Sequence, residues 1–272
     1  MIENNILIDQ FKITVWDYYR NHFRSMPWRT DTNPYYVMVS ELMLQQTQVQ
    51  RVLIKFDEFI TRFPSIESLA EASLTELLET WIGLGYNRRA RFLKQSADII
   101  VNDFNGQFPT TLEDWIKLPG FGYNTACAVL VYSQNIPLVF IETNIRSVFI
   151  HHFYADSFSV DDKSIESIVR ATLDLENPRE WYWALMDYGS FLKKEHGNIS
   201  RKSSSYSKQS KFEGSFRQKR ATILKEIVKR KVVSFNELMQ ITNYSTEILS
   251  LALVKLTEEN FIAGENEQFW IV

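Results

Sequence analysis

A glycine-containing segment between two predicted helices has the residue types of a phosphate-binding turn. Residues 118–126 read Leu-Pro-Gly-Phe-Gly-Tyr-Asn-Thr-Ala, and the glycines at Gly120 and Gly122 permit a positive φ angle. Such a turn leaves backbone N–H groups uncovered at the start of the next helix, where they bind phosphate without a charged side chain. Tyr123 and Thr125 lie in that first turn and are further candidates for phosphate contact. The alternative is an ordinary corner between two helices, in which Gly-x-Gly is also common.

A second segment combines one carboxylate with three amides. It reads Ser-Glu-Leu-Met-Leu-Gln-Gln-Thr-Gln-Val over 40–49. On a continuous helix Glu41, Gln45 and Gln48 lie at i, i+4 and i+7, so one face is polar. Amide groups can pair with the edges of nucleic-acid bases or fill a vacated base position. A polar face exposed to solvent is the alternative.

The third segment reads Val-Phe-Ile-Glu-Thr-Asn-Ile-Arg-Ser-Val over 139–148. Glu142 follows an apolar run, so its carboxylate emerges from the core at the start of the next helix. Taken alone, a carboxylate at this place caps the helix and interacts favourably with its dipole.

The rest of the first 200 residues supplies helices that position these segments. Apolar residues recur with helical spacing from Leu42 to Ile60 and in seven later stretches. Those stretches are 73–82, 88–102, 112–117, 125–133, 144–152, 163–173 and 179–192. Ser73 followed by Glu76 predicts a capping box, and no strand pair with a hairpin turn is evident. We therefore predict an all-α body.

The composition excludes several classes of protein and site. The 272 residues are 45 % hydrophobic and 23 % charged, as in an ordinary folded domain. The single cysteine, Cys127, excludes an internal disulfide and any all-cysteine metal or iron–sulfur site. His151 and His152 have no partners at metal-ligand spacing, so no metal site is predicted. No run approaches the ~18 apolar residues of a membrane span, and no secretory signal is visible. We expect a cytoplasmic protein.

The net charge of −3 hides a basic segment near the end of the body. Residues 193–220 hold nine Lys or Arg and two Glu, a local charge of +7, which suits a polyanion. Solvated linker lysines are the alternative. Six of the eleven residues from 200 to 210 are serine, which is typical of a linker. We predict a body over 1–197, a basic serine-rich linker over 198–215 and a small domain over 216–272.

The small domain differs in pattern from the body. A basic amphipathic helix is predicted over 216–230 and a helix pair over 234–241 and 245–259, followed by a two-stranded hairpin around Gly264. Three helices and a terminal β-ribbon suggest a winged helix-turn-helix. A dimerisation or packing module of the same shape is the alternative.

Taken together and in this order, the three segments resemble the helix-hairpin-helix DNA glycosylases, and within them the MutY-type adenine DNA glycosylases. The similar stretches are Met-Pro-Trp-Arg over 26–29, Asn-Pro-Tyr over 33–35, residues 40–49, Gly-Leu-Gly-Tyr over 83–86, Arg-Ala-Arg over 89–91 and Leu-Pro-Gly over 118–120. The resemblance covers about residues 8–195. It implies two helical lobes with a cleft: a six-helix lobe with the hairpin over 28–140, and a second lobe from 1–27 and 141–197.

The resemblance also implies a chemistry, in which an adenine is flipped out of duplex DNA and its N-glycosidic bond is hydrolysed. Glu41 is then the acid that protonates adenine at N7, which requires a pKa raised by burial. Glu142 stands where the family has Asp, and it stabilises the cationic sugar and positions water. Gln45 and Gln46 approach the estranged base and the vacated stack.

Three further residues match positions near the base. Bifunctional relatives carry a lysine nucleophile where this chain has Asn124, so a monofunctional glycosylase without strong strand cleavage is expected. The family's Gly-Tyr-Tyr stacking tyrosine is replaced, because Tyr86 is followed by Asn87. Tyr86, Asn87 and Asn124 are candidates for base contact.

The region after the body departs from the family. Most relatives bind a four-iron cluster there through four cysteines, and here the serine-lysine linker replaces that motif, so no cluster is expected. Lys202, Lys208 and Lys211 are candidates to supply the phosphate contacts instead. The hairpin carbonyls are candidates for a monovalent cation. The family's domain that recognises 8-oxoguanine gives way to the small domain, so that specificity is not inherited.

The sequence thus predicts a monofunctional adenine DNA glycosylase of base excision repair. Double-stranded DNA is the expected partner, at the nucleoid, and we expect a monomer that does not bind membranes. Two alternatives stay open. One is a related glycosylase with a changed base pocket that removes thymine, uracil or a modified base. The other is a non-catalytic DNA-binding or lesion-sensing protein.

Overall fold

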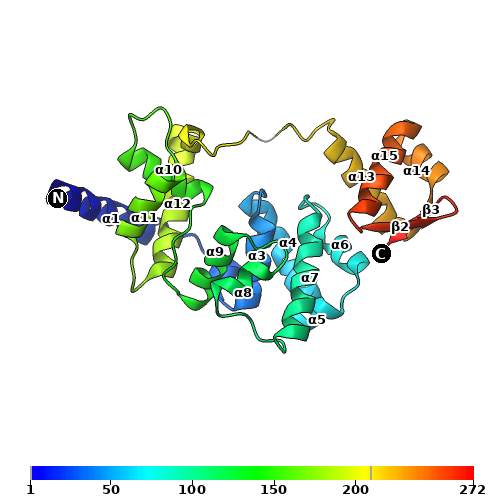
Figure 1. The fold of residues 1–272 in the computed structure, drawn as a ribbon, viewed down its shortest axis with the longest axis horizontal. Helices are drawn as coiled ribbons and strands as arrows, with labels where there is room; N and C mark the ends of the chain where they lie inside the picture. Colours follow the sequence, from blue (N-terminus) through cyan, green and yellow to red (C-terminus); the bar gives the residue numbers. More distant parts are fainter. Residues whose placement is uncertain (1, 209) are drawn as a thin grey trace. The chain divides into compact units, whose positions relative to one another are not determined.

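The computed structural model describes residues 2–208 and 210–272. Met1 of the predicted body and Gln209 of the predicted linker lie outside the described residues. The rest is helical apart from one small sheet near the end of the chain (Figure 1), which confirms the predicted fold class. Within those ranges no helix is long and apolar enough to cross a membrane. The chain divides into two compact units, each assembled from separate segments.

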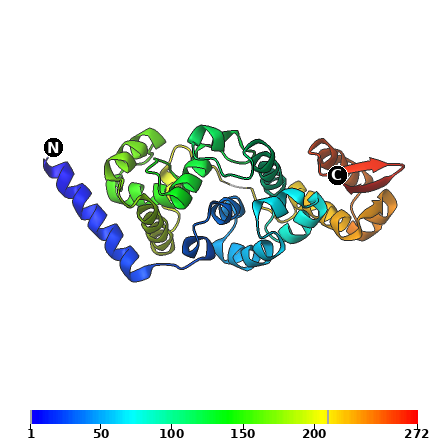
Figure 2. The ribbon, with the colours of Figure 1, turned by 90° about the horizontal axis from the view of Figure 1, so that it is seen from below.

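The first unit comprises residues up to Glu41, Pro109–Lys117 and Phe121–Lys208. Its elements are α1 (Ile2–His22), α2 (Pro27–Thr30), most of α3 (Pro34–Leu44), α8 (Leu112–Lys117), α9 (Tyr123–Gln134), α10 (Thr143–Phe153), α11 (Asp162–Thr172), α12 (Pro178–His196) and the 3-10 helix η1 (Ile199–Lys202). The long helix α1, blue in Figure 2, packs along α12, and α12 also packs against α9 and α10. Trp181 of α12 lies at the centre of this core, in contact with Phe11 of α1.

The second unit comprises Leu42–Phe108, Leu118–Gly120 and the residues from 209 on. Its body elements are α4 (Val49–Arg62), α5 (Ile66–Glu71), α6 (Leu74–Trp81) and α7 (Arg88–Asp103). The capping box predicted at Ser73 and Glu76 is confirmed at the start of α6. Arg62 reaches the same Glu76 with an ion pair of 2.7 Å between exposed side chains.

The end of the chain completes the second unit with three helices and a sheet. These elements are α13 (Phe216–Arg230), β1 (Val232–Ser234), α14 (Phe235–Thr242), α15 (Thr246–Glu258), β2 (Ile262–Glu265) and β3 (Gln268–Ile271). The strands form an antiparallel sheet in the order β1-β3-β2. Helix α13 packs against α14, α15 and the sheet, and also against α6. This is the winged-helix arrangement predicted from the sequence.

The terminal hairpin turns two residues later than predicted. Asn266 and Glu267 both have positive φ, 50° and 60°, and they form the turn between β2 and β3. Such a turn favours asparagine, which tolerates the left-handed conformation. Gly264 lies instead inside β2, where a Cβ atom would come within 2.7 Å of the ring of Phe269. The glycine is there to let that ring lie against the strand.

The helix predicted to continue through the glutamines is interrupted. Helix α3 ends at Leu44 and α4 begins at Val49, with a turn between them. Gln46 has a φ angle of 57°, which no helix accepts. The polar face predicted for Glu41, Gln45 and Gln48 is therefore wrong, because only Glu41 lies in α3. Because of the break, the side chains of Gln45 and Gln48 do not share a helical face with Glu41.

Candidate active site

Glu41 lies in the last part of α3, where it is only 8 % exposed. Its helix neighbours Met38, Leu42 and Met43 are fully buried, so the segment is fixed by the core. Burial raises the pKa of Glu41 well above that of an ordinary glutamate, and the negative charge of Glu142 raises it further. Glu41 therefore keeps its proton to a higher pH, as a general acid requires.

Glu142 is the N-cap residue of α10, but its side chain makes no capping hydrogen bond. For this residue taken alone, the sequence favoured a helix cap that also interacts with the helix dipole; the structure confirms the N-cap position but not a side-chain capping bond. Burial raises the pKa of Glu142, whereas the positive charge of Arg146 lowers it. The two glutamates are therefore electrostatically coupled but lie in different surroundings, and such a difference is the usual way to assign one carboxyl as acid and the other as base.

Arg29 is a cation within electrostatic range of Glu41, and its charge opposes the rise in the pKa of that carboxyl. Its guanidinium is held by both carboxylate oxygens of Asp187, at 2.9 and 3.0 Å. Arg24 donates to the same carboxylate at 2.7 Å. The charge of Arg29 is thus fixed beside the site by a buried carboxylate 158 positions away in the sequence.

Arg146 is fixed in a similar way, one helical turn after Glu142. Both of its hydrogen bonds go to Asp162 at the start of α11, each 2.9 Å long. Asp162 also accepts a hydrogen bond of 2.9 Å from Ser205, and one of 3.4 Å from Ser203. Ser203 and Ser205 of the predicted linker therefore hold the carboxylate that pairs with Arg146.

Tyr132 of α9 is a site residue that the sequence analysis missed. It is 6 % exposed, and its pKa is raised well above the usual value by burial and then by the charges of Glu41 and Glu142. The phenol of Tyr132 therefore lies within electrostatic range of both carboxylates. The sequence contained one signal, because Tyr132 lies two helical turns after Asn124 and on a similar face of α9.

Asn124 holds the segment that leads to Glu142. Its Nδ2 donates to the carbonyl oxygen of Ile141 at 3.2 Å, and its Oδ1 accepts the backbone N–H of Ile141 at 3.4 Å. Nearby, Tyr182 donates to the carbonyl of Leu138 at 2.9 Å and accepts from the N–H of Phe140 at 3.3 Å. Two side chains therefore fix the backbone before Glu142. The predicted base contact of Asn124 stays a prediction.

The two hairpin glycines differ in conformation. Gly120 has a φ angle of 86°, and a Cβ atom there would come within 3.0–3.2 Å of Phe92 and Leu42. Gly122 has a φ angle of −71°, so it does not use the positive φ that glycine permits. It is the N-cap of α9 with no side-chain cap, and a Cβ atom there would meet open space. This glycine leaves the helix start uncovered, while Tyr123 beside it is 51 % exposed.

Gln45 reaches the hairpin turn, since its Nε2 donates to the carbonyl of Gly120 at 3.3 Å. The turn that carries Gln45 and Gln46 is held by the buried guanidinium of Arg89, which donates to the carbonyls of Leu42 and Met43 at 2.8 Å. The cation predicted at the hairpin carbonyls stays a prediction. The phosphate and base contacts predicted for the hairpin and for these glutamines also stay predictions.

Tyr86 and Asn87 lie together at the start of α7. Tyr86 has a φ angle of 48°, and Asn87 is the N-cap residue of α7 without a side-chain capping bond. Arg217 of α13 donates to the hydroxyl of Tyr86 at 3.0 Å. Tyr86, which the sequence analysis connected with base contact, is therefore hydrogen-bonded to α13, the first helix of the small domain.

The lysines predicted to contact phosphate differ in their surroundings. Lys202 donates to the carbonyl of Ala155 at 2.5 Å, whereas Lys208 and Lys211 are exposed. The segment after α12 presents serine hydroxyls and no thiols, which does not fit an iron–sulfur cluster. Among the described residues, no group of three or more His, Cys, Asp or Glu side chains could hold a metal ion.

Comparison with known proteins gives one family and a set of relatives. Residues 39–173 match the family described as "HhH-GPD superfamily base excision DNA repair protein", a segment that includes Glu41, the hairpin and Glu142. Adenine DNA glycosylase of Buchnera aphidicola subsp. Baizongia pistaciae (strain Bp) is 37 % identical over 188 residues, which is 67 % of this chain and 52 % of that protein. Adenine DNA glycosylase of Mycobacterium tuberculosis (strain CDC 1551 / Oshkosh) is 36 % identical over 189 residues, 67 % of this chain and 61 % of that protein. The chain thus spans about half to three fifths of the length of these relatives.

Solved structures show the same fold at lower identity. A thermostable thymine-DNA glycosylase superposes with a TM-score of 0.64 at 22 % identity, covering 75 % of this chain and 98 % of that one. A trapped covalent intermediate of endonuclease III with DNA, an estranged-adenine complex, gives 0.54 at 16 % identity and covers 78 % and 91 %. These similarities concern the fold alone.

Proposed function

Because the chain belongs to the HhH-GPD superfamily of base excision DNA repair proteins, we propose that it is a DNA glycosylase that removes a mispaired adenine from duplex DNA. The curated relatives are named adenine DNA glycosylases, and that name supports adenine as the substrate. The observation that carries the proposal is the pair of glutamates, Glu41 and Glu142, each with a pKa raised by burial. Because its proposed substrate is DNA, we expect the protein at the nucleoid.

The first step is proton transfer to the leaving base. Glu41 gives its proton to N7 of a flipped adenine, and the electrons of the bond between C1′ and N9 pass to the base. Adenine protonated at N7 is a far better leaving group than neutral adenine. Glu41 suits this task because its raised pKa keeps it protonated to a higher pH than an ordinary glutamate. Tyr132 lies within electrostatic range of both carboxylates.

The second step is hydrolysis of the cationic sugar. Glu142, whose charged form Arg146 favours, stabilises positive charge at C1′ and holds the attacking water. Water oxygen bonds to C1′, and the proton that water loses returns the glutamate pair to its starting state. The products are free adenine and an abasic site. Glu142 is one methylene longer than aspartate. The two hydrogen bonds between Asn124 and the backbone of Ile141 must therefore set where the Glu142 carboxylate lies.

Release without strand cleavage follows from the side chain at position 124. A strand-cleaving relative needs an amine that forms a Schiff base with C1′, and the amide of Asn124 cannot form one. Lys117, the nearest lysine in the sequence, lies at the end of α8 and pairs with Asp114 at 2.8 Å. We therefore infer a monofunctional enzyme. Borohydride should trap no covalent complex between the enzyme and cleaved DNA.

The test is single-turnover excision on a panel of duplexes. The panel places adenine, thymine, uracil or a modified base opposite guanine, 8-oxoguanine and cytosine, and hot alkali then reveals abasic sites. We expect product at adenine, with loss of at least 100-fold in rate for both E41Q and E142Q, in line with general acid–base and electrostatic contributions. The control is E113Q, which changes an exposed glutamate on α8.

Three outcomes would contradict the proposal or one of its parts. Cleavage at a pyrimidine alone would keep the two glutamates and move the substrate to thymine or uracil. Salt-sensitive binding to DNA with no product from any duplex would leave a non-catalytic DNA-binding protein. Unchanged rates in E41Q would remove Glu41 as the acid.

A further inference from the structure

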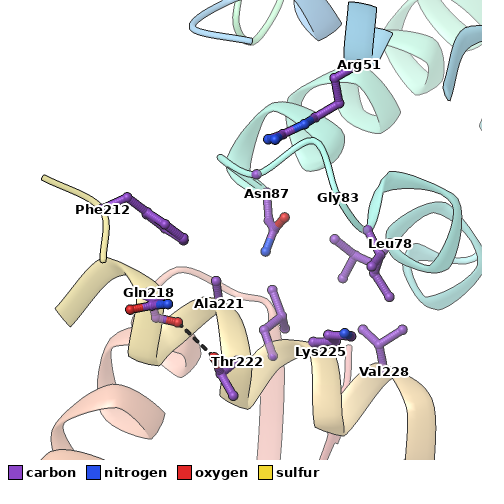
Figure 3. A pocket seen from close by; sticks show the side chains of 13 residues that line it. Arg51, Leu78, Gly83, Asn87, Phe212, Gln218, Ala221, Thr222, Lys225 and Val228 are labelled. Carbon is purple, nitrogen blue, oxygen red and sulfur yellow. Dashed lines mark hydrogen bonds between the residues drawn. The ribbon is translucent and has the colours of Figure 1, made fainter. Parts of the chain in front are cut away.

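The second unit contains a cavity of about 340 Å³ that the proposed reaction does not use. It opens where the loop between α6 and α7 faces α13 (Figure 3), and Arg51 of α4 borders it. A volume of this size lies at the lower end of the range for small-molecule sites, and it suits one nucleobase with its sugar and phosphate. Neither Glu41 nor Glu142 lines it.

The floor of the cavity is apolar. Leu78, Leu224 and Val228 form part of the lining and are at most 3 % exposed. Phe212 lies at the edge, and 48 % of it is exposed to solvent. An apolar floor beside an exposed aromatic ring is a surface on which a base stacks.

Amide groups border the same cavity. Asn87 extends from its loop toward α13 in Figure 3, and neither its Oδ1 nor its Nδ2 has a hydrogen bond to a described residue. Gln218 lies opposite on α13, where its Oε1 accepts the N–H of Gly214 at 2.6 Å. The amide of Asn87 offers one acceptor and two donors, which is the set that reads the edge of a base.

The two charged residues that line the cavity are both positive. Arg51 and Lys225 both line it, and neither forms an ion pair with a described residue. None of the thirteen lining residues is Asp or Glu. Two cations without an anion beside them favour an anionic ligand, and phosphate is the anion that accompanies a base.

Side-chain contacts join the two walls of the cavity, which are α13 on one side and the loop that leads into α7 on the other. The guanidinium of Arg217 lies 5.2 Å from the ring centre of Tyr86 and donates to its hydroxyl. Glu259, at the end of α15, pairs with Arg220 of α13 and with Arg88 of α7, the latter at 3.3 Å. The walls are therefore held by specific side chains, so the space between them is part of the fold.

We propose that this cavity binds one unstacked nucleotide, with the base on the apolar floor beside Phe212, its edge at Asn87, and its phosphate at Arg51 and Lys225. The inference rests on the proposed function for one point, that the nucleotide belongs to DNA. A free nucleotide has the same chemistry and is the other source that the experiment must separate.

The test compares binding to two fluorescein-labelled duplexes by anisotropy, one fully paired and one with a single unpaired thymidine. The wild-type chain should bind the second duplex about tenfold more tightly, since stacking one base on an aromatic ring is worth that much or more. N87A, F212A and K225A should each reduce this preference toward one. Affinity for the paired duplex should change little. The assay contains no excision step, so it reports on the cavity even if the glycosylase assignment fails.

Matched controls separate the cavity from general effects. K229A removes an exposed lysine from the same helix outside the cavity, and F158A removes a fully exposed phenylalanine. Both should keep the wild-type preference. In a second arm, millimolar dAMP and dTMP are titrated against the chain by NMR. Saturable shifts at Asn87 with no preference for the unpaired thymidine would establish a free-nucleotide site. No preference and no shifts would overturn the proposal.

Discussion

Asn124 holds Ile141 by both of its backbone groups, with hydrogen bonds of 3.2 and 3.4 Å, one residue before Glu142. The clasp joins α9, which follows the hairpin, to the start of α10, which carries the second carboxylate. The position that the family resemblance matches to the lysine of strand-cleaving relatives thus holds a side chain that fixes the backbone next to Glu142.

Removing this clasp should slow excision without weakening DNA binding. In N124A the backbone before Glu142 is free to move, and a misplacement of about 1 Å can cost about 100-fold in rate. We expect single-turnover excision to fall about 10–100-fold while the dissociation constant for duplex DNA stays unchanged. N124D keeps the acceptor for the Ile141 N–H and should recover part of the rate. A rate in N124A equal to wild type would show that Glu142 is fixed by other contacts.

The rate of excision should depend on pH with a maximum. The proposed mechanism requires Glu41 protonated and Glu142 ionised, and burial raises the pKa of both. The rate should fall on the alkaline side as Glu41 loses its proton, and on the acid side as Glu142 gains one. Single-turnover rates across the pH range would reveal both limbs. R146A, which removes the charge that favours ionised Glu142, should move the acid limb to higher pH.

The buried acid should also make stability depend on pH. The unfolded chain ionises its glutamates near a pKa of ~4.3, whereas folded Glu41 keeps its proton to higher pH. The contribution of Glu41 to the free energy of unfolding is therefore complete below the unfolded pKa of ~4.3. It is lost as the pH rises from there through the raised pKa of the folded state. E41Q is neutral throughout, so its Tm should match wild type near pH 4 and exceed it in alkali. The gain should be about 2–4 °C for each kcal/mol.

Calorimetry of E41Q and of the exposed-site variant E113Q across the same pH range would check this dependence. The difference between E113Q and wild type should be flat with pH. A constant difference for E41Q as well would show that Glu41 ionises in the folded protein much as it does in the unfolded chain.

The sequence was sufficient to predict a Glu41 with a pKa raised by burial and most of the helices. Helical spacing and the capping box at Ser73 predicted local structure, because both depend on residues within one or two turns. The break after Leu44 escaped this reasoning, since a spacing of seven from Leu42 to Val49 fits a continuous helix equally well. The ion pair of Arg29 with Asp187 could not be predicted, because no local pattern links residues 158 positions apart.

Removing one partner of that ion pair should be among the most destabilising single substitutions in the first unit. Asp187 has only 1 % of its side chain exposed, and Arg29 only 5 %. D187N would leave the buried guanidinium of Arg29 without a counter-ion, at a cost of about 3–5 kcal/mol. The Tm should fall by roughly 10 °C or more. The exposed pair of Arg20 with Asp17 is the matched control, and D17N should change stability by less than about 1 kcal/mol. Equal effects of D187N and D17N would show that Arg29 finds another partner.

The lysines after α12 should govern how DNA binding depends on salt. Lys208 and Lys211 are exposed, whereas the ammonium of Lys202 is already held by the carbonyl of Ala155. Each phosphate contact contributes about 0.9 to the slope of log K against log salt. We therefore expect the double variant K208A/K211A to flatten that slope by roughly 1.8. K208R/K211R keeps the charge and should keep the slope, and K202A should change it little. A slope in K208A/K211A equal to that of the wild-type chain would exclude both lysines from contact with the DNA backbone.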